Sequence, residues 1–499
     1  MPLENNNGCI DINSTKQTYT SLEDNIKYIR NTFSYTDDLQ IREIIHAKHK
    51  GVLIYLETMA DAEIIERTFL VPLAMNRKRK DPTKLISNVE LATSDDLNKA
   101  VKEIMNGACV YFQEDKLESF IFQSQINQSR SPEEPENEKI VRGSHQGFVE
   151  GLEANINLIR SRLRSPKLSV NYLQVGTESS TRVAIIYMDN IANPEIVSEI
   201  QRRVSSISLD TIIAPGYIEE AIEEYPLSPF PQNLFTERPD RLKAHLIEGC
   251  VAIMSEGSSD AIVLPVTFFS FFQSPDDYNS RYYEGSFFRM IRIMSFFGAL
   301  ILPALYVAII GFHFEIIPFD MITLMKDATE RIPFPPLSEA ILMVITIELI
   351  REAGIRLPTP IGQTIGIVGG LIIGDAVVSA GLVSNIMVIV IALTAIMSFA
   401  ISSYEIGNVV RILSFPILIG AATLGFVGIT FGVVFLIIHM CKLQTLGVPY
   451  LYPMSPLNIK GLKDAIVRFP IWLLNNRPNF LRTQKDKRQE KTRGWDKNG

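Results

Sequence analysis

The sequence predicts an α/β N-terminal cytoplasmic region of two subdomains, followed by an all-α multi-pass membrane domain. Apolar runs are short and interrupted by charge up to about residue 290, and beyond it they are long enough to span a bilayer. Of the 499 residues, 46% are hydrophobic and 21% charged, which suits a soluble part joined to a membrane part. The polar N-terminus has no basic end followed by an apolar core, so we expect no cleavable signal peptide.

The first soluble subdomain is predicted at residues 38–124, after a disordered N-terminus at 1–37 that is too polar to offset its ordering entropy. Cys109–Gln113 and Ser119–Gln123 are rich in strand-forming residues, and EDKLE between them predicts a hairpin. A polar, proline-bearing linker follows at 125–139.

The second soluble subdomain is predicted at 140–260. Apolar residues spaced by four, four, three and four from Phe148 to Leu163 predict an amphipathic helix, with Arg160 mostly off its apolar stripe. Further elements are predicted as strands at Leu168–Val175 and Arg182–Met188 and as a helix at Pro194–Val204.

The membrane domain is predicted at 285–442. Its predicted spans are 293–313, 361–381, 385–403 and 412–439. Residues 337–356 are apolar but carry several charges, each costing about 2.5–3.5 kcal/mol at a bilayer centre, so a re-entrant or interfacial helix packed against protein is expected there.

The flanking charges predict the topology. Arg281, Arg289 and Arg292 precede the first span, and a basic tail at 477–499, predicted to be disordered, follows the last. Both ends are therefore expected in the cytoplasm, with an even number of crossings.

Within 337–356, Glu348, Arg351 and Glu352 have the three- and four-residue spacing at which helical side chains pair, which lowers the cost of burying them. This re-entrant charge cluster either lines a hydrated vestibule or only fixes the helix.

A glycine ladder lies in the span 361–381. Gly362, Gly366, Gly370 and Gly374 fall at every fourth position, which on a helix gives one shallow groove suited to a close helix neighbour in lipid. The neighbour is either in the same chain or in another copy around a central axis, and an accidental pattern is the third reading.

Three residues of this helix are candidates for facing a pore. Val368 and Ile372 would form an apolar ring that gates by dewetting. Asp375 either has a functional role at a pore mouth or simply lies at the membrane interface.

Several function classes have no residues to support them. The net charge of −7 argues against general nucleic-acid binding, so no nucleic acid is expected as a partner. The four cysteines form no CxxC pair, and no P-loop, HExxH or GxSxG motif is present. We therefore expect no catalytic residues, no metal site and no cofactor, and a protein that is not an enzyme.

Four stretches carry a family resemblance. They are VRGSHQGFVEGLEANINLIRSRLRSPKL (141–168), SPFPQNLFTERPD (228–240), QSPDDYNSR (273–281) and PFPPLSEAILMVITIELIREAGIRLPTPIGQTIGIVGGLIIGDAVVSAGLVS (333–384). The chain resembles the A subunits of the GerA-type spore germinant receptors over about residues 140–450.

The resemblance implies a receptor subunit in the inner membrane of bacterial spores. It further implies a transporter-like B subunit and a lipoprotein C subunit as partners, and a homo-oligomer in the lipid bilayer that forms a nutrient-gated ion channel. The alternatives are a non-conducting receptor scaffold, an A-like subunit associated with dipicolinate release, and a secondary transporter. The absence of an internal repeat argues against the transporter.

Overall fold

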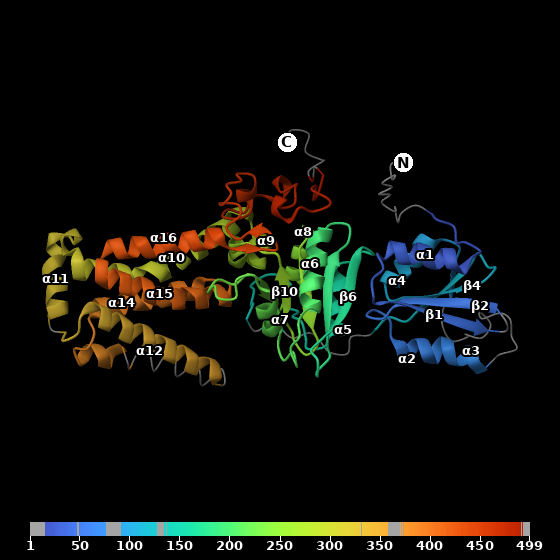
Figure 1. Ribbon diagram of the computed structural model, residues 1–499, viewed down its shortest axis with the longest axis horizontal. Coiled ribbons are helices and arrows are strands. Elements are labelled where there is room, and N and C mark those ends of the chain that lie inside the picture. Colours follow the sequence, from blue (N-terminus) through green and yellow to red (C-terminus); the bar gives the residue numbers. More distant parts are fainter. Residues whose placement is uncertain are drawn as a thin grey trace. The chain divides into compact units, whose positions relative to one another are not determined.

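The computed structural model describes residues 15–46, 49–75, 91–126, 134–135, 137–330, 332–357, 370, 372, 374–490 and 492 (Figure 1). The chain divides into two compact units. The first consists of Met1–Glu223, Asn233–Pro265 and Asn475–Gly499, and the second of Glu224–Gln232 and Val266–Leu474. The first is α/β and the second is mainly helical, as predicted.

The first unit begins with a five-stranded antiparallel sheet in the order β1-β2-β4-β5-β3. Its strands are β1 (Leu39–His46), β2 (His49–Leu56), β3 (Ala92–Ser94), β4 (Ala108–Gln113) and β5 (Ser119–Gln123). Its helices are α1 (Leu22–Thr32), α2 (Ala62–Ile65), the π-helical turn η1 (Glu66–Leu70), α3 (Val71–Met75) and α4 (Leu97–Met105). The predicted hairpin is confirmed as β4–β5.

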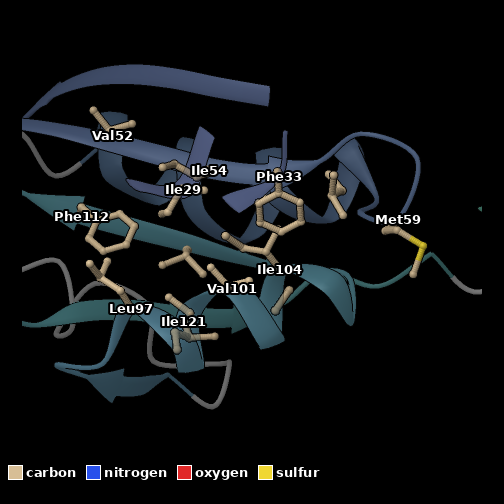
Figure 2. Packing of buried hydrophobic residues seen from close by; sticks show 14 residues of the cluster. Ile29, Phe33, Val52, Ile54, Met59, Leu97, Val101, Ile104, Phe112 and Ile121 are labelled. Atoms are coloured by element: carbon tan, nitrogen blue, oxygen red, sulfur yellow. The ribbon is translucent and has the colours of Figure 1, made fainter. Parts of the chain in front are cut away.

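This sheet has helices on both faces, α1 and α4 on one and α2 and α3 on the other (Figure 1). Alternate residues of β2 therefore enter two different cores. Val52 and Ile54 pack with Phe33 and α4, as Figure 2 shows, whereas Leu53 packs with Phe69. Because both faces of the sheet are buried, β2 contains a continuous run of apolar residues and not an alternating one.

Helix α1 corrects the prediction of disorder for the described part of residues 1–37, and residues 1–14 lie outside the described residues. Ser21 caps it by accepting a hydrogen bond from the Asp24 amide, and its residue Ile29 and the following Phe33 are fully buried in the core. A few apolar residues at helical spacing are enough to order the segment, although its overall composition is polar.

The second five-stranded antiparallel sheet has the order β6-β7-β9-β10-β8. Its strands are β6 (Leu168–Val175), β7 (Thr181–Met188), β8 (Leu234–Thr236), β9 (Val251–Ser255) and β10 (Ala261–Leu264). Its helices are α5 (Leu152–Arg162), α6 (Pro194–Ser205), α7 (Pro215–Ile222) and α8 (Pro239–Glu248). The predicted helices and strands of this subdomain are confirmed within two residues, except that α5 starts at Leu152.

A buried ion pair joins the two subdomains of this unit. Arg160 of α5 donates from Nε to Asp38 Oδ2 at 2.5 Å and from Nη2 to Asp38 Oδ1 at 2.6 Å. Thr36 and Thr58 also donate to this carboxylate. The side chains of Arg160 and Asp38 are only 4% and 0% exposed, so Arg160 is not on a solvated face as its spacing predicts.

The described part of the basic tail also differs from the prediction of disorder. Arg477 Nε donates to the Ile247 carbonyl at 2.8 Å, and Gln484 Nε2 donates to the Ala192 carbonyl at 2.8 Å. These side chains satisfy backbone carbonyls of the second subdomain, which orders the segment in spite of its charge. Of the predicted linker 125–139, residues 127–133 and 136 lie outside the described residues.

Asp260, just before β10, predicts a pH effect on stability. Burial raises the pKa of its carboxyl from 3.8 to about 6, and the carboxylates of Glu237 and Glu138 add to the rise. The folded state thus keeps a proton that the unfolded state loses, so the free energy of unfolding falls as pH rises from about 4 to about 6 and stays lower above it.

Asp260→Asn is expected to remove this decline and to raise the melting temperature at pH 7, as measured by thermal unfolding of the full chain from pH 4 to pH 8. Asp189→Asn, which changes an exposed carboxylate beyond β7, is the matched control. An unchanged slope in Asp260→Asn contradicts the assignment.

The second unit contains the long apolar helices. Its helices are α9 (Pro275–Asn279), α10 (Tyr282–Phe312), α11 (Phe319–Glu330), α12 (Pro336–Arg356), α14 (Asn385–Ala400), α15 (Tyr404–Leu424) and α16 (Phe426–Lys442), and a short ribbon follows with β11 (Gln444–Thr445) and β12 (Val448–Pro449). Short 3₁₀ turns lie at Phe268–Phe272, Phe314–Ile316, Gly461–Lys463 and Ile471–Leu473. In the described chain, α10 and α15 are long and apolar enough to cross a membrane, and α14 and α16 are shorter apolar helices.

Contacts at the helix ends fix the directions within the bundle of α10, α14, α15 and α16 (Figure 1). His313, just after α10, stacks on Phe426 at the start of α16 with ring centroids 4.4 Å apart. Tyr306 near the end of α10 hydrogen-bonds Ser384, the cap of α14, at 2.9 Å. Ser402, between α14 and α15, donates to the Phe271 carbonyl, which precedes α10. Helices α14 and α16 are therefore antiparallel to α10 and α15.

Helix α12 packs against this bundle as a continuous 21-residue helix. Its Glu339 accepts from the Ser384 amide at 2.9 Å at the start of α14, and its Arg351 lies 4.7 Å from the Phe399 ring centroid near the end of α14. It thus packs on protein as predicted, and it runs along α14 without turning back, while the re-entrant or interfacial position of 337–356 in the membrane stays a prediction.

The predicted span 412–439 is wrong as a single helix. The chain turns at Gly425, which has a φ of 61°, and continues as α16 packed against α15. A Cβ at Gly428 would lie 1.9 Å from the Gly420 carbonyl oxygen, so these helices touch backbone to backbone. The pattern of apolar residues does not predict this turn, because no charged residue lies near it in either helix.

Candidate functional site in the helical unit

The glycine ladder is partly described. Gly362, Gly366 and Val368 lie outside the described residues, and residues 374–379 are helical. At Gly370 and Gly374 an added Cβ would have nothing within 4 Å, so no helix of the described chain packs against this end of the ladder. The close intramolecular glycine contact is instead Gly420 with Gly428, which the sequence reasoning missed.

The other candidates on this helix face outward. Ile372 is 59% exposed, and Asp375 is exposed and forms no ion pair with any residue that the structure describes. The described ladder glycines, Gly370 and Gly374, form an open face that we call the glycine face, whereas Ile372 and Asp375 lie on other sides of the same helix.

The predicted charge cluster divides into two. Arg351 lies 3.3 Å from Glu348, as its spacing predicts, whereas Glu352 pairs with Arg356 at 2.6 Å on an exposed surface. Arg411 of α15 joins the first pair, with 3.8 Å between its Nη1 and Glu348 Oε2. The site is therefore Glu348, Arg351 and Arg411.

This site borders a half-open cavity of about 40 Å³ lined by residues of α10, α12, α14 and α15. Its walls are mostly apolar, from Ala299 and Pro303 of α10 to Val344 of α12 and Ile391 of α14. Thr394, Ser398 and Ser414 add hydroxyls. The two guanidinium groups are held in place by aromatic faces, Arg351 over Phe399 at 4.7 Å and Arg411 over Tyr404 at 5.8 Å.

Arg411 was missed because the sequence reasoning started its last span at residue 412. A helix traced back from the apolar block to the Ser403 cap includes Arg411 as an isolated charge two turns into α15. A lone arginine inside an apolar helix calls for a partner, and that signal could have identified it.

A second polar cluster fastens the beginning of α10. Arg289, fully buried, lies 3.0 Å from Asp277 of α9 and 3.0 Å from Asp464, and Arg292 also pairs with Asp277. Arg468 donates to the Asp277 carbonyl at 2.6 Å. Arg289, one of the basic residues that precede the first predicted span, is thus a buried, ion-paired residue that fastens α10.

The other reactive side chains that the structure describes do not gather into a site. Among the described residues, no group of three or more His, Cys, Asp or Glu is placed to hold a metal ion. Cys109 and Cys250 are buried, and burial raises the pKa of each thiol well above its ordinary value, so both are protonated at neutral pH. His439 hydrogen-bonds Ser228 at 2.9 Å.

Comparison with known families identifies the chain. Residues 27–480 match the family model described as Bacillus/Clostridium GerA spore germination protein. The chain belongs to the GerA family.

Its GerA relatives align over most of their length. It is 38% identical to the uncharacterized membrane protein YfkQ of Bacillus subtilis, covering 86% of this chain and 85% of the relative. It is 34% identical to spore germination protein KA of Bacillus subtilis, covering 94% of this chain and 88% of the relative. It is 36% identical to spore germination protein GerLA of Bacillus cereus, covering 92% of this chain and 95% of the relative.

A solved structure was also found, the N-terminal domain of the A subunit of the Bacillus megaterium spore germinant receptor GerK3. It is 22% identical, with a TM-score of 0.40, and covers 51% of this chain and 98% of that one.

Proposed function

We propose that this GerA-family chain is the A subunit of a nutrient germinant receptor in the spore inner membrane. Copies of it assemble through the glycine face into an ion channel that nutrients open, and opening begins germination. The observation that carries this proposal is the open space at Gly370 and Gly374. In lipid, a glycine ladder packs either against a helix of the same chain or against a helix of a second copy. The open space at these two glycines favours the second copy.

The bundle geometry supports a multi-pass arrangement. Helices α10, α14, α15 and α16 alternate in direction, and α15, with 21 residues, is about 31 Å long, close to the hydrocarbon thickness. Helices α12 and α14 run in the same direction, and we keep the predicted span 361–381 as a crossing between them. We propose six crossings in place of four, with both termini in the cytoplasm.

The surface of the bundle supports contact with lipid or protein. Large apolar side chains are exposed on every proposed crossing helix of the described chain, including Leu349, Ile389, Ile412 and Phe435. The spore germination relatives and the family resemblance favour a transporter-like B subunit and a lipoprotein C subunit as partners. Nutrient binding in such a complex opens the channel only by its difference in affinity for the open and closed states.

The glycine face provides the test. Gly374→Leu is expected to slow nutrient-triggered germination about tenfold or more and to shift the detergent-solubilised protein to smaller assemblies, because a side chain inserted into a close helix contact costs about 1–3 kcal/mol. Val368→Ala is expected to change ion leak by altering the apolar ring. Germination and ion release are measured in spores with unchanged subunit level.

Gly354→Leu is the matched control, because Gly354 of α12 also has open space beside it but lies outside the ladder. Normal assembly and germination with Gly374→Leu contradicts the proposal. Normal assembly without conductance in reconstituted vesicles favours the non-conducting scaffold, and conductance that follows dipicolinate supply favours the release-associated alternative.

A further inference from the structure

The cavity at Glu348 contains more positive than negative charge. Among the residues that line it, Glu348 is the acid, whereas Arg351 and Arg411 both supply guanidinium groups. Arginine stays protonated at any physiological pH, so the excess of one positive charge is permanent. In an apolar surrounding an uncompensated charge is costly, and the cost is relieved by a counter-ion.

Some hydrogen-bond donors around the cavity also lack an acceptor among the described residues. Arg351 Nε, Arg411 Nε and Ser398 Oγ are each shielded from solvent and have no hydrogen-bond partner among the described residues. A buried donor without an acceptor costs about 1–3 kcal/mol. The donors come from α12, α14 and α15, three different elements that face one cavity.

The volume limits what the cavity can hold. About 40 Å³ is enough for a few water-sized groups, since one water requires about 10–15 Å³ on this measure. A halide or a carboxylate head group fits within this volume. Water would satisfy the donors but leave the positive charge, so the observations favour an anion.

We propose that Arg351 and Arg411 form a binding site for a small monovalent anion, either an inorganic ion such as chloride or a carboxylate group. The anion accepts hydrogen bonds from guanidinium groups on α12 and α15 and thereby ties α12 to the bundle. This inference goes beyond the channel proposal and does not depend on it, because binding can be measured on the purified chain.

Thermal unfolding of the detergent-solubilised full chain tests the proposal. Sodium chloride, acetate or nitrate replaces the sodium salt of MES, a bulky sulfonate without a carboxylate, at constant ionic strength. We expect a saturable rise in melting temperature with at least one of the small anions, as for any ligand that binds only the folded state. Comparing chloride with acetate distinguishes an inorganic anion from a carboxylate.

Three variants make the result specific. Arg411→Gln is expected to weaken the apparent affinity about tenfold or more, and Arg356→Gln, an exposed arginine on the same helix as Arg351, is expected to leave it unchanged. Val344→Glu introduces a carboxylate from the cavity wall, and it is expected to raise the melting temperature in the MES salt and to abolish the response to small anions.

The response of Val344→Glu decides the question even if Arg411→Gln does not fold. The proposal is overturned if the wild-type chain shows no saturable response, or if Val344→Glu or a folded Arg411→Gln responds like Arg356→Gln.

Discussion

Gly428→Ala is expected to prevent accumulation of the folded chain, with at least a tenfold drop in membrane-bound protein. A Cβ there would lie 1.9 Å from the Gly420 carbonyl oxygen and 2.4 Å from its carbonyl carbon. Because these are backbone atoms that cannot rotate away, α15 and α16 would have to separate along their contact. Overpacking costs about 1–3 kcal/mol when side chains can adjust, and more is expected here.

Gly311→Ala is the matched control for this substitution. Gly311 lies near the end of α10, and an added Cβ there would have nothing within 4 Å. Its replacement should be neutral or slightly stabilising, by up to about 1 kcal/mol from helix propensity. The amount of full-length protein and its melting temperature in detergent are the measurements. Equal behaviour of the two variants would show that α15 and α16 are not packed backbone to backbone.

Arg160→Leu is expected to destabilise the α/β unit by about 3–5 kcal/mol, because it leaves the Asp38 carboxylate buried without its cation. For a unit of this size that corresponds to a drop of roughly 10 °C in melting temperature. Thermal unfolding of the full chain, followed by circular dichroism, measures it.

Two further variants separate the charge effect from lost packing. Arg164→Leu, an exposed arginine just beyond the same helix, should change stability by no more than about 0.5 kcal/mol. The double variant Asp38→Leu with Arg160→Leu should recover much of the loss, since it removes both buried charges. No recovery would mean that Arg160 acts through packing and its hydrogen bond to the Leu168 carbonyl.

Local patterns predicted most of the α/β unit. The strands β6 and β7 and the helix α6 follow from alternation, turn residues and helical spacing, which depend on neighbours along the chain. The burial of Arg160 could not be predicted this way, because its partner Asp38 is 122 residues away. The same holds for α1, whose Ile29 is ordered by a sheet that follows it.

The candidate site was predicted only in part for a related reason. Helical spacing correctly paired Glu348 with Arg351, since three-residue neighbours meet on any helix. The same spacing accounts for the exposed pair of Glu352 with Arg356, four residues on, but it could not bring in Arg411 from another helix. The glycine pattern predicted a close contact, but the intramolecular contact that the structure describes lies at Gly420 and Gly428.

The two ends of helix α12 are held in different ways, the first by burial and the second mainly by charged side chains. Its buried residues are Glu339, Ala340 and Met343, all in its first two and a half turns, while Leu349 and Ile355 are exposed. The outer part is attached through the charges around Arg351. From Glu339 to Arg356 the helix extends about 25 Å, so a tilt of about 10° would displace its end by about 4 Å. The position of the outer end of α12 therefore depends on the charges around Arg351, whereas its first turns are held by burial.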